Sequence, residues 1–225
     1  MRSLALLCVT VFSLVALAGC AGEEDDDEGS EGGSSSESFD TTAVGAIPAG
    51  WDVVTGTWKV EASAQARSAP NLIRQSATDQ EYTVLLDDGA GEYTDLQATV
   101  KFYIDGGVTQ KGAGIAFRYN EAGAHYVVRY NHAELAWHLF RFTNAVDKQK
   151  IDAATVDGSA QYGGFQKWIT LVVNMEGQRI VAYADGHKVI DYTDTDPAGS
   201  KEGHVGIWGR GDTIAMFDDF HVNPL

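Results

Sequence analysis

The chain has 225 residues and a formal net charge of −16, from 32 acidic and 16 basic side chains. This length suits one large domain or two small ones. The acidic balance argues against nucleic acid as a partner and against attraction to an anionic membrane surface. With only two cysteines, Cys8 and Cys20, the chain cannot form a multi-disulfide scaffold.

The first twenty residues resemble the signal peptide of a bacterial lipoprotein. Arg2 supplies a positive charge, residues 4–17 are almost wholly apolar, and the run ends in Leu-Ala-Gly-Cys at Cys20. The apolar run is too short to span a bilayer comfortably. The resemblance implies a signal peptide over 1–19, cleavage before Cys20 and acylation of Cys20. The alternative is an ordinary secretory signal with a chance cysteine.

Lipidation at Cys20 would leave the mature protein with no thiol for a disulfide, a metal or nucleophilic catalysis. Ala21 follows the cysteine, which resembles outer-membrane sorting. We therefore expect a cell-envelope protein, held at the outer membrane through its lipid only.

Residues 20–38 form the acylated cysteine and an acidic tether rich in Gly and Ser. Residues 21–40 carry nine acids and no base. Such a segment cannot bury enough apolar surface to offset its ordering entropy, so it is expected to be disordered. It is either a plain spacer or an acidic export signal of the kind found on some surface lipoproteins.

Residues 39–225 are predicted to form one all-β domain. Short runs alternate between apolar and polar residues with period two, and Gly or Asp separates them. The predicted strands are 57–61, 82–86, 96–104, 114–119, 125–131, 135–143, 168–175, 179–184, 188–192, 204–208 and 213–222. So many short strands without a sustained helical period indicate a two-sheet antiparallel sandwich of jelly-roll type.

Motifs along this region resemble those of concanavalin A-like domains. They are FD at 39–40, IPAGW at 47–51, GTWKV at 56–60, GAGIAFRY at 112–119, YVVRYN at 126–131, LFR at 139–141, GHVGIW at 203–208 and FDDF at 217–220. Their order is similar to laminin G-like and 3-keto-disaccharide hydrolase-like domains of bacterial surface proteins. This fold hosts lectins, glycanases and adhesive modules, so the resemblance alone does not assign an activity.

Alternation within three strands separates an aromatic face from an arginine face. The aromatic face, with Tyr126 and Phe140, is expected to be core. The other face is expected to bind glycan, because forked donors pair with hydroxyls and aromatic rings stack on sugars. Its candidate carbohydrate-binding residues are Arg118, Arg129, Asn131, Glu134, Trp137, Arg141 and Trp208. The alternative is that these arginines only pair with the protein's many carboxylates.

No catalytic motif is complete in the sequence. The carboxylate string of laminarinase-type glycanases and the zinc spacing His-Glu-x-x-His are both missing. A 3-keto-glycoside hydrolase or lyase would need a base beside an acidified proton, for which Glu134 and Asp212 are candidates. We expect a monomer that binds glycan without cleaving it; the alternatives are this enzyme and an adhesive or scaffolding module with a protein partner.

A structural calcium ion is also expected. Related sandwich modules use an acid of the last strand together with one near the first strand. Asp40 and Asp219 occupy such positions, and carboxylates are suitable ligands for this hard cation. The alternative is that both acids are simply solvated.

Overall fold

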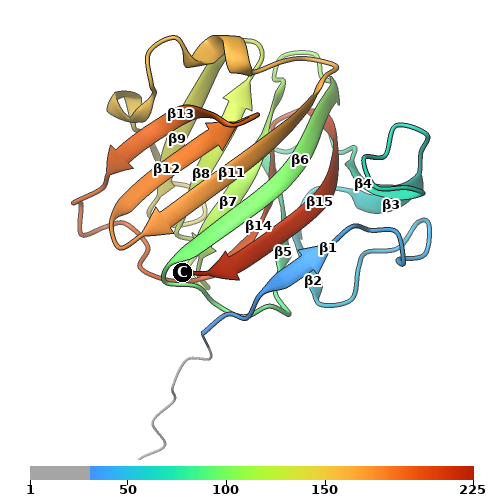
Figure 1. The fold of residues 1–225 in the computed structure, drawn as a ribbon, viewed down its shortest axis with the longest axis horizontal. Coiled ribbons are helices and arrows are strands. Elements are labelled where there is room, and N and C mark those ends of the chain that lie inside the picture. The colour runs from blue at the N-terminus through green and yellow to red at the C-terminus, as the bar shows by residue number, and fades with distance from the viewer. Residues whose placement is uncertain (1–30) are drawn as a thin grey trace, which may run out of the picture.

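The computed structural model describes residues 31–225, which form two packed antiparallel sheets (Figure 1). The signal peptide, Cys20 and the tether as far as residue 30 lie outside these residues. Within residues 31–225, no helix is long and apolar enough to cross a membrane. The predicted all-β two-sheet sandwich is confirmed.

The strands divide into an eight-stranded and a seven-stranded sheet. The eight-stranded sheet runs in the order β13 (His187–Thr193), β12 (Arg179–Ala184), β11 (Trp168–Glu176), β6 (Leu96–Gly106), β15 (Ile214–Pro224), β4 (Asn71–Gln75) and β3 (Trp58–Ala62), with β1 (Ser35–Glu37) also paired to β15. The seven-stranded sheet runs β10 (Lys148–Lys150), β9 (Ala136–Phe142), β8 (His125–Asn131), β7 (Gly112–Tyr119), β14 (His204–Arg210), β5 (Tyr82–Asp87) and β2 (Trp51–Thr55). Two short 3₁₀ helices, η1 (Asp152–Ala154) and η2 (Ser159–Tyr162), connect β10 to β11.

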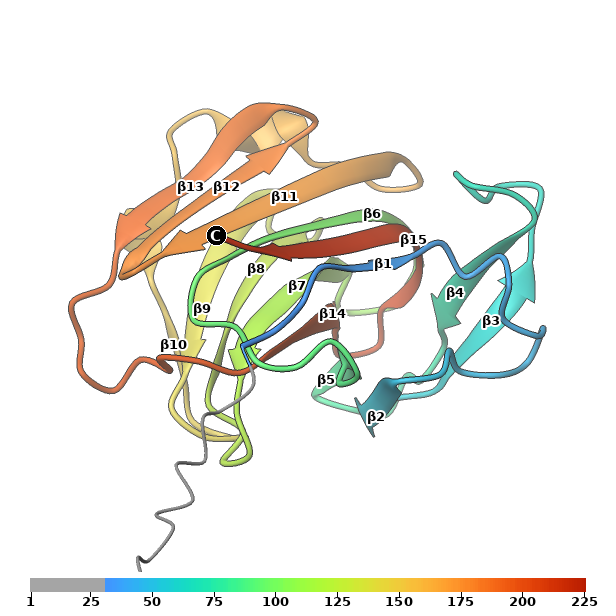
Figure 2. The same cartoon turned by 60° about the horizontal axis from the view of Figure 1, so that its bottom comes forward.

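The domain begins earlier than the sequence suggested. The expectation of disorder up to residue 38 is wrong for Ser35–Glu37, which pairs with residues 220–222 of β15. Figure 2 shows β1 lying along β15. The first half of β15 pairs with β4 and the second half with β1, and the register shifts at Asp218 and Asp219 between them. Backbone pairing therefore orders a segment whose side chains have little to bury.

The core lies between the sheets and is rich in aromatic side chains. Phe102, Phe117, Phe217 and Trp137 are fully buried there. Burial of each side chain of this size stabilises the fold by about 1.5–3 kcal/mol relative to exposure.

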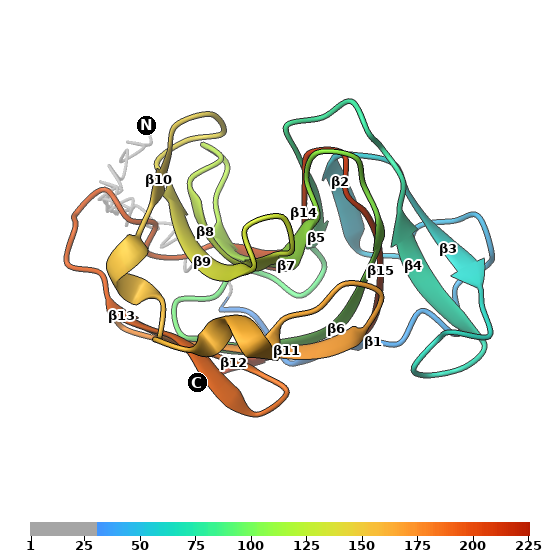
Figure 3. The same ribbon diagram turned by 90° about the horizontal axis from the view of Figure 1, so that it is seen from above.

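The seven-stranded sheet is strongly curved. Figure 3 shows that the face turned away from the other sheet is concave across β8, β7, β14 and β5. This concave face is not purely polar, because Val84, Ala116, Val127, Phe142 and Trp208 form a second buried cluster on it. Both faces of the central strands are therefore buried, which determines where a binding site can lie.

Candidate functional site

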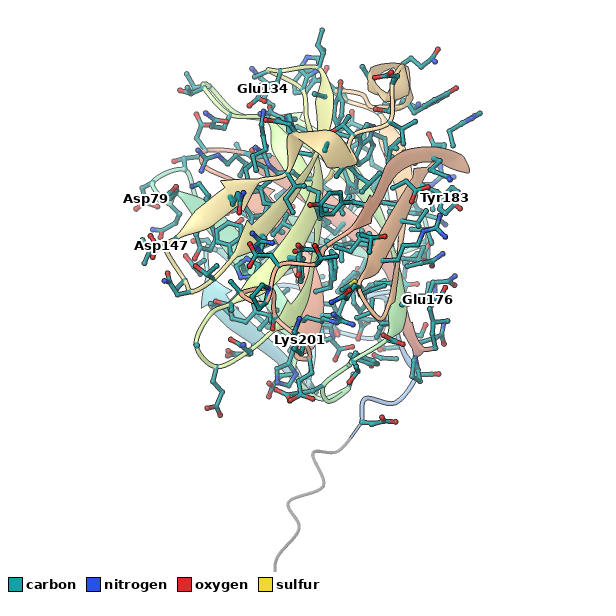
Figure 4. All side chains as sticks on the ribbon, turned by 90° about the vertical axis from the view of Figure 1, so that its left-hand side faces the viewer. Asp79, Glu134, Asp147, Glu176, Tyr183 and Lys201 are labelled. Atoms are coloured by element: carbon teal, nitrogen blue, oxygen red, sulfur yellow. The ribbon has the colours of Figure 1, made fainter. Side chains whose placement is uncertain are left out.

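A pocket of about 190 Å³ opens on the concave face of the seven-stranded sheet. Strands β8, β9, β10 and β14 and two adjoining loops supply its lining. The lining residues are Gln110, Arg129, Glu134, Phe140, Phe142, Lys148, Trp208 and Arg210. Figure 4 shows Glu134 at one end of the molecule, while Tyr183 and Glu176 mark the opposite sheet. The pocket thus combines aromatic rings with charged groups of both signs.

Arg129 lines this pocket beside two aromatic rings. Its guanidinium lies 4.8 Å from the ring centroid of Phe140 and 5.5 Å from that of Trp208, both within the range of cation–π attraction. The residue is 4% exposed. Burial lowers the pKa of the Arg129 guanidinium to about 10. The positive charge of Arg210 also lowers this pKa, whereas the negative charge of Glu134 raises it.

An aromatic row continues along the concave face beside Arg129. Tyr82 stacks on Trp208 at 6.0 Å between ring centroids and meets Phe142 edge-on at 5.6 Å. His125 also stacks on Phe142, at 4.1 Å between ring centroids, and lies 6.4 Å from the ring of Tyr82. Tyr82 and Phe140 are half-buried, so their rings are partly available to a ligand.

Glu134 is positioned by a hydrogen bond in the β8–β9 hairpin and lies beside a histidine. The side-chain amide of Asn131 donates to Glu134 Oε1 over 2.7 Å. Nε2 of His138 lies 2.7 Å from Glu134 Oε2. Burial and the nearby charge of Arg129 hold the pKa of His138 below its ordinary value. Asn131 is itself fully buried, so it acts on the pocket through Glu134.

The predicted place of Arg118 is wrong. Arg118 has a left-handed backbone with φ of 51°, and the register of β7 against β14 shifts beside it. Its guanidinium therefore leaves the concave face and pairs with Asp95 at 3.2 Å, while also donating to the carbonyls of Thr94 and Gly177. Tyr119 moves to the concave face, where it stacks on His125.

The two faces of β9 are inverted relative to the prediction. Antiparallel pairing sets Trp137 opposite Tyr130 and Arg141 opposite Tyr126, so both lie on the inner side with the core. Trp137 is fully buried, and Arg141 is 4% exposed and bound to Asp194. Phe140, expected in the core, faces the concave pocket instead. Tyr126 is buried in the core as expected.

Of the seven residues predicted to bind carbohydrate, Arg129, Glu134 and Trp208 line the pocket and Asn131 supports it. Arg118, Trp137 and Arg141 lie elsewhere. Sequence reasoning missed Gln110, Phe142 and Lys148 as pocket residues. Parity would have placed Phe142 on this face once the register of β9 against β8 was known. Lys148 lies on a short exposed edge strand that has no sequence signal.

The candidate base Asp212 has a structural role. Its two carboxylate oxygens accept hydrogen bonds from the backbone N–H groups of Val108, Thr109 and Gln110, at 2.7–2.9 Å. Burial alone would raise the pKa of Asp212, but these hydrogen bonds hold it below its ordinary value. Asp212 therefore shapes the loop that carries Gln110 into the pocket.

The expected calcium ligands each have a partner of their own. Asp40 Oδ1 accepts the backbone N–H of Asn71 at 2.9 Å, and Asp219 lies 2.5 Å from the ammonium of Lys101. In the part of the chain that the structure describes, no group of three or more His, Cys, Asp and Glu side chains could hold a metal ion. The calcium site stays a prediction.

The fold and the pocket together define a β-sandwich domain with an aromatic, cation-bearing pocket on its concave sheet. Residues 36–223 match the family model described as the 3-keto-alpha-glucoside-1,2-lyase-like domain. The chain belongs to this family. A search of curated proteins found no match.

Several solved structures share the fold. The carbohydrate binding module CBM66 from Bacillus subtilis is 20% identical with a TM-score of 0.61, covering 77% of this chain and 95% of that one. The cellulose induced protein Cip1 is 12% identical with a TM-score of 0.58, covering 84% and 97%. A GH43 protein of Bacillus licheniformis, BlXynB, is 13% identical with a TM-score of 0.56, covering 84% of this chain and 39% of that one. At these identities the likeness concerns the fold alone.

Proposed function

We propose that the protein binds carbohydrate in the concave pocket. The observation that carries this proposal is the arrangement of Arg129 between Phe140 and Trp208 in an open pocket. Aromatic rings offer a surface for the apolar face of a sugar, and arginine supplies several fixed donors for its oxygens. The family match to a sugar-lyase-like domain and the similarity to a carbohydrate binding module support the same class of ligand.

Replacing Phe140 by alanine is expected to weaken glycan binding by about tenfold or more, which corresponds to about 1.4 kcal/mol of binding energy. Phe140 is half-buried at the pocket, so its removal should cost less stability than the about 3–5 kcal/mol of a packed aromatic residue. A glycan array identifies the ligand, and calorimetric titration measures the affinity. Tyr183→Ala is the matched control, because Tyr183 is a half-buried aromatic residue on the opposite sheet. Unchanged affinity in Phe140→Ala would rule out this pocket.

A second candidate function is the elimination or hydrolysis of 3-keto-glycosides. The family description and one geometric feature favour it: the Glu134 carboxylate, which accepts a hydrogen bond from Asn131 and lies beside His138, faces the pocket. A ketone at C3 acidifies the proton on C2. Glu134 would remove this proton as a base, and Arg129 would stabilise the resulting enolate oxygen. The enolate would then form a C1–C2 double bond while the substituent on C1 leaves with the electrons of its bond and takes up the proton from Glu134. Addition of water to that double bond would complete a hydrolysis.

The purified protein separates binding from cleavage when it is incubated with a 3-keto-disaccharide. If the wild type releases the C1 substituent and Glu134→Gln does not, the protein is a lyase or hydrolase. Binding of the disaccharide without release would leave the binding function alone.

We also propose that the chain is anchored to the outer membrane by acylation of Cys20. Glu31, where the described chain begins, bridges to Glu92. Figure 4 shows that the chain enters the domain at the end opposite to Glu134. The tether to Cys20 therefore joins the domain at the end away from Glu134. Cells expressing Cys20→Ser should incorporate no labelled palmitate into the protein, and continued labelling would overturn the anchor.

A further inference from the structure

Arg129 differs from the other buried arginines in having no carboxylate partner. Arg118 pairs with Asp95, and Arg141 pairs with Asp194 and Asp196. Arg129 is buried to the same extent, yet no carboxylate of residues 31–225 lies within 4.0 Å of it. The protein thus gives its buried guanidinium groups in the interior an ion-pair partner, whereas the one in the pocket has none among residues 31–225.

The nitrogens of Arg129 are also unpartnered. Nε and Nη1 are shielded from solvent and have no hydrogen-bond partner among the described residues, so access from the pocket is through Nη2. Phe140 and Trp208 pack against the guanidinium. Gly112 makes room for it, since a Cβ at that position would lie 2.8 Å from Nη1. The arrangement holds the charge in place without neutralising it, which is costly unless a ligand provides the counter-charge.

The pocket around Arg129 is locally cationic although the protein is acidic. Its lining carries three cations, Arg129, Lys148 and Arg210, against the single carboxylate of Glu134. Glu134 is engaged by Asn131 and His138. Just outside the lining, Glu81 contacts Lys148 and Arg210 and offsets part of their charge, which leaves Arg129 as the lining cation without an ion pair among residues 31–225. In a chain of net charge −16 such a site selects for negative ligands over the rest of the surface.

We propose that this pocket recognises a saccharide that carries an oxyanion, such as the carboxylate of a uronic acid or a sulfate or phosphate ester, placed against Arg129. The inference rests on the proposed carbohydrate binding and narrows its ligand class. A guanidinium forms short charge-assisted hydrogen bonds with such groups. Burial lowers the pKa of Arg129, and an anion bound beside the guanidinium would offset this effect. The aromatic neighbours would contact the sugar ring, and Lys148 and Arg210 would flank the anion.

Calorimetric titration of the full-length chain in detergent micelles tests the proposal. Three probes of equal length are compared: a galacturonate disaccharide, a sulfated disaccharide and a neutral glucose disaccharide. At least one anionic probe is expected to bind about tenfold or more tighter than the neutral one. The stronger of the two anionic probes shows whether the carboxylate or the ester is the natural group.

The variant Arg129→Gln should lose this preference while retaining weak binding of the neutral probe. Arg129→Lys keeps the charge but lacks the planar guanidinium with its paired donors, so it should retain part of the preference for anionic probes. Arg179→Gln is the matched control, because Arg179 is an exposed arginine on the opposite sheet, paired with Asp191. A thermal melt of each variant verifies folding.

The outcomes separate the two proposals. Equal affinity for neutral and anionic probes, with Phe140→Ala still weakening both, would overturn the anionic ligand and keep carbohydrate binding. An anionic preference that survives in Arg129→Gln would overturn the role of Arg129. Binding of none of the probes, together with an empty glycan array, would overturn carbohydrate binding itself.

Discussion

Replacing Arg141 by methionine is expected to lower the free energy of unfolding by about 3–5 kcal/mol. Nη1 of Arg141 lies 2.7 Å from both carboxylate oxygens of Asp194, and both residues are at most 4% exposed. Burial alone would raise the pKa of Asp194, but the hydrogen bonds from Arg141, the Asp196 N–H and Tyr126 hold it below its ordinary value. Removing the guanidinium leaves a buried carboxylate without its cation. Urea denaturation at neutral pH measures the change.

Arg129→Met is the matched control for this prediction. Arg129 is equally buried but has no carboxylate partner among residues 31–225, so removing it leaves no buried carboxylate without its cation. The free energy of unfolding is expected to stay within about 1 kcal/mol of the wild type, since lost cation–π contacts are offset by relief of an uncompensated charge. Adding Asp194→Asn to Arg141→Met should recover part of the lost stability. Equal losses in Arg129→Met and Arg141→Met would show that ion pairing does not distinguish the two sites.

The sandwich could be predicted because its longer strands bury one or both faces in a regular period. Every strand predicted from alternation corresponds to a strand of the structure, and β8 and β12 have the predicted bounds. The strands that were missed are β1, β2, β4 and β10. Lys148–Lys150 is exposed throughout, and Ser35–Glu37 lies in an acidic segment without large apolar residues, so neither carries a burial pattern. Their pairing depends on neighbouring strands, which local sequence does not encode.

The candidate site was predictable only in part, because the two faces of β9 are both aromatic. Trp137 and Leu139 fill the core, while Phe140 and Phe142 cover the concave face. Alternation separates these pairs but does not say which one points inward. The register against β8 decides it, and a shift by one residue would exchange the faces. Arg118 fails for a different reason, since its left-handed backbone breaks the alternation within β7.

The chemistry of the site differs from that expected from the sequence. The sequence suggested a row of three arginines, whereas the structure keeps Arg129 and joins it to an aromatic row and to Glu134. Residues far apart in the chain meet there: Tyr82 of β5 stacks on Trp208 of β14, and Phe142 of β9 contacts both Tyr82 and His125. A sheet that buries its outer face in this way can rigidify a binding pocket without any covering loop.

His125 makes this aromatic row sensitive to pH. The ring is fully buried and stacks on Phe142 at 4.1 Å and on Tyr119 at 4.6 Å. Nδ1 lies 2.8 Å from the carbonyl oxygen of Gly123, which fixes the proton on that nitrogen. Nε2 is buried without a partner in the described part of the chain. Burial lowers the pKa of His125 to about 4, despite the opposing effect of the Gly123 hydrogen bond, so the folded protein holds the neutral ring.

The free energy of unfolding is therefore expected to fall as the pH drops below about 6.5. Below this pH the unfolded chain binds a proton at His125, whereas the folded chain binds it only near pH 4. The contribution is fully present above pH 6.5. At about 1.4 kcal/mol per pH unit, about 2 kcal/mol is lost by pH 5 and about 3 kcal/mol by pH 4. His125→Phe keeps an aromatic ring in the stack and removes the titration. Urea denaturation of both proteins at pH 7 and pH 5 measures the difference, in which the titration of His138 and of the carboxylates cancels. The variant should lose about 2 kcal/mol less than the wild type between these two values, and parallel losses would mean that His125 is charged in the folded protein.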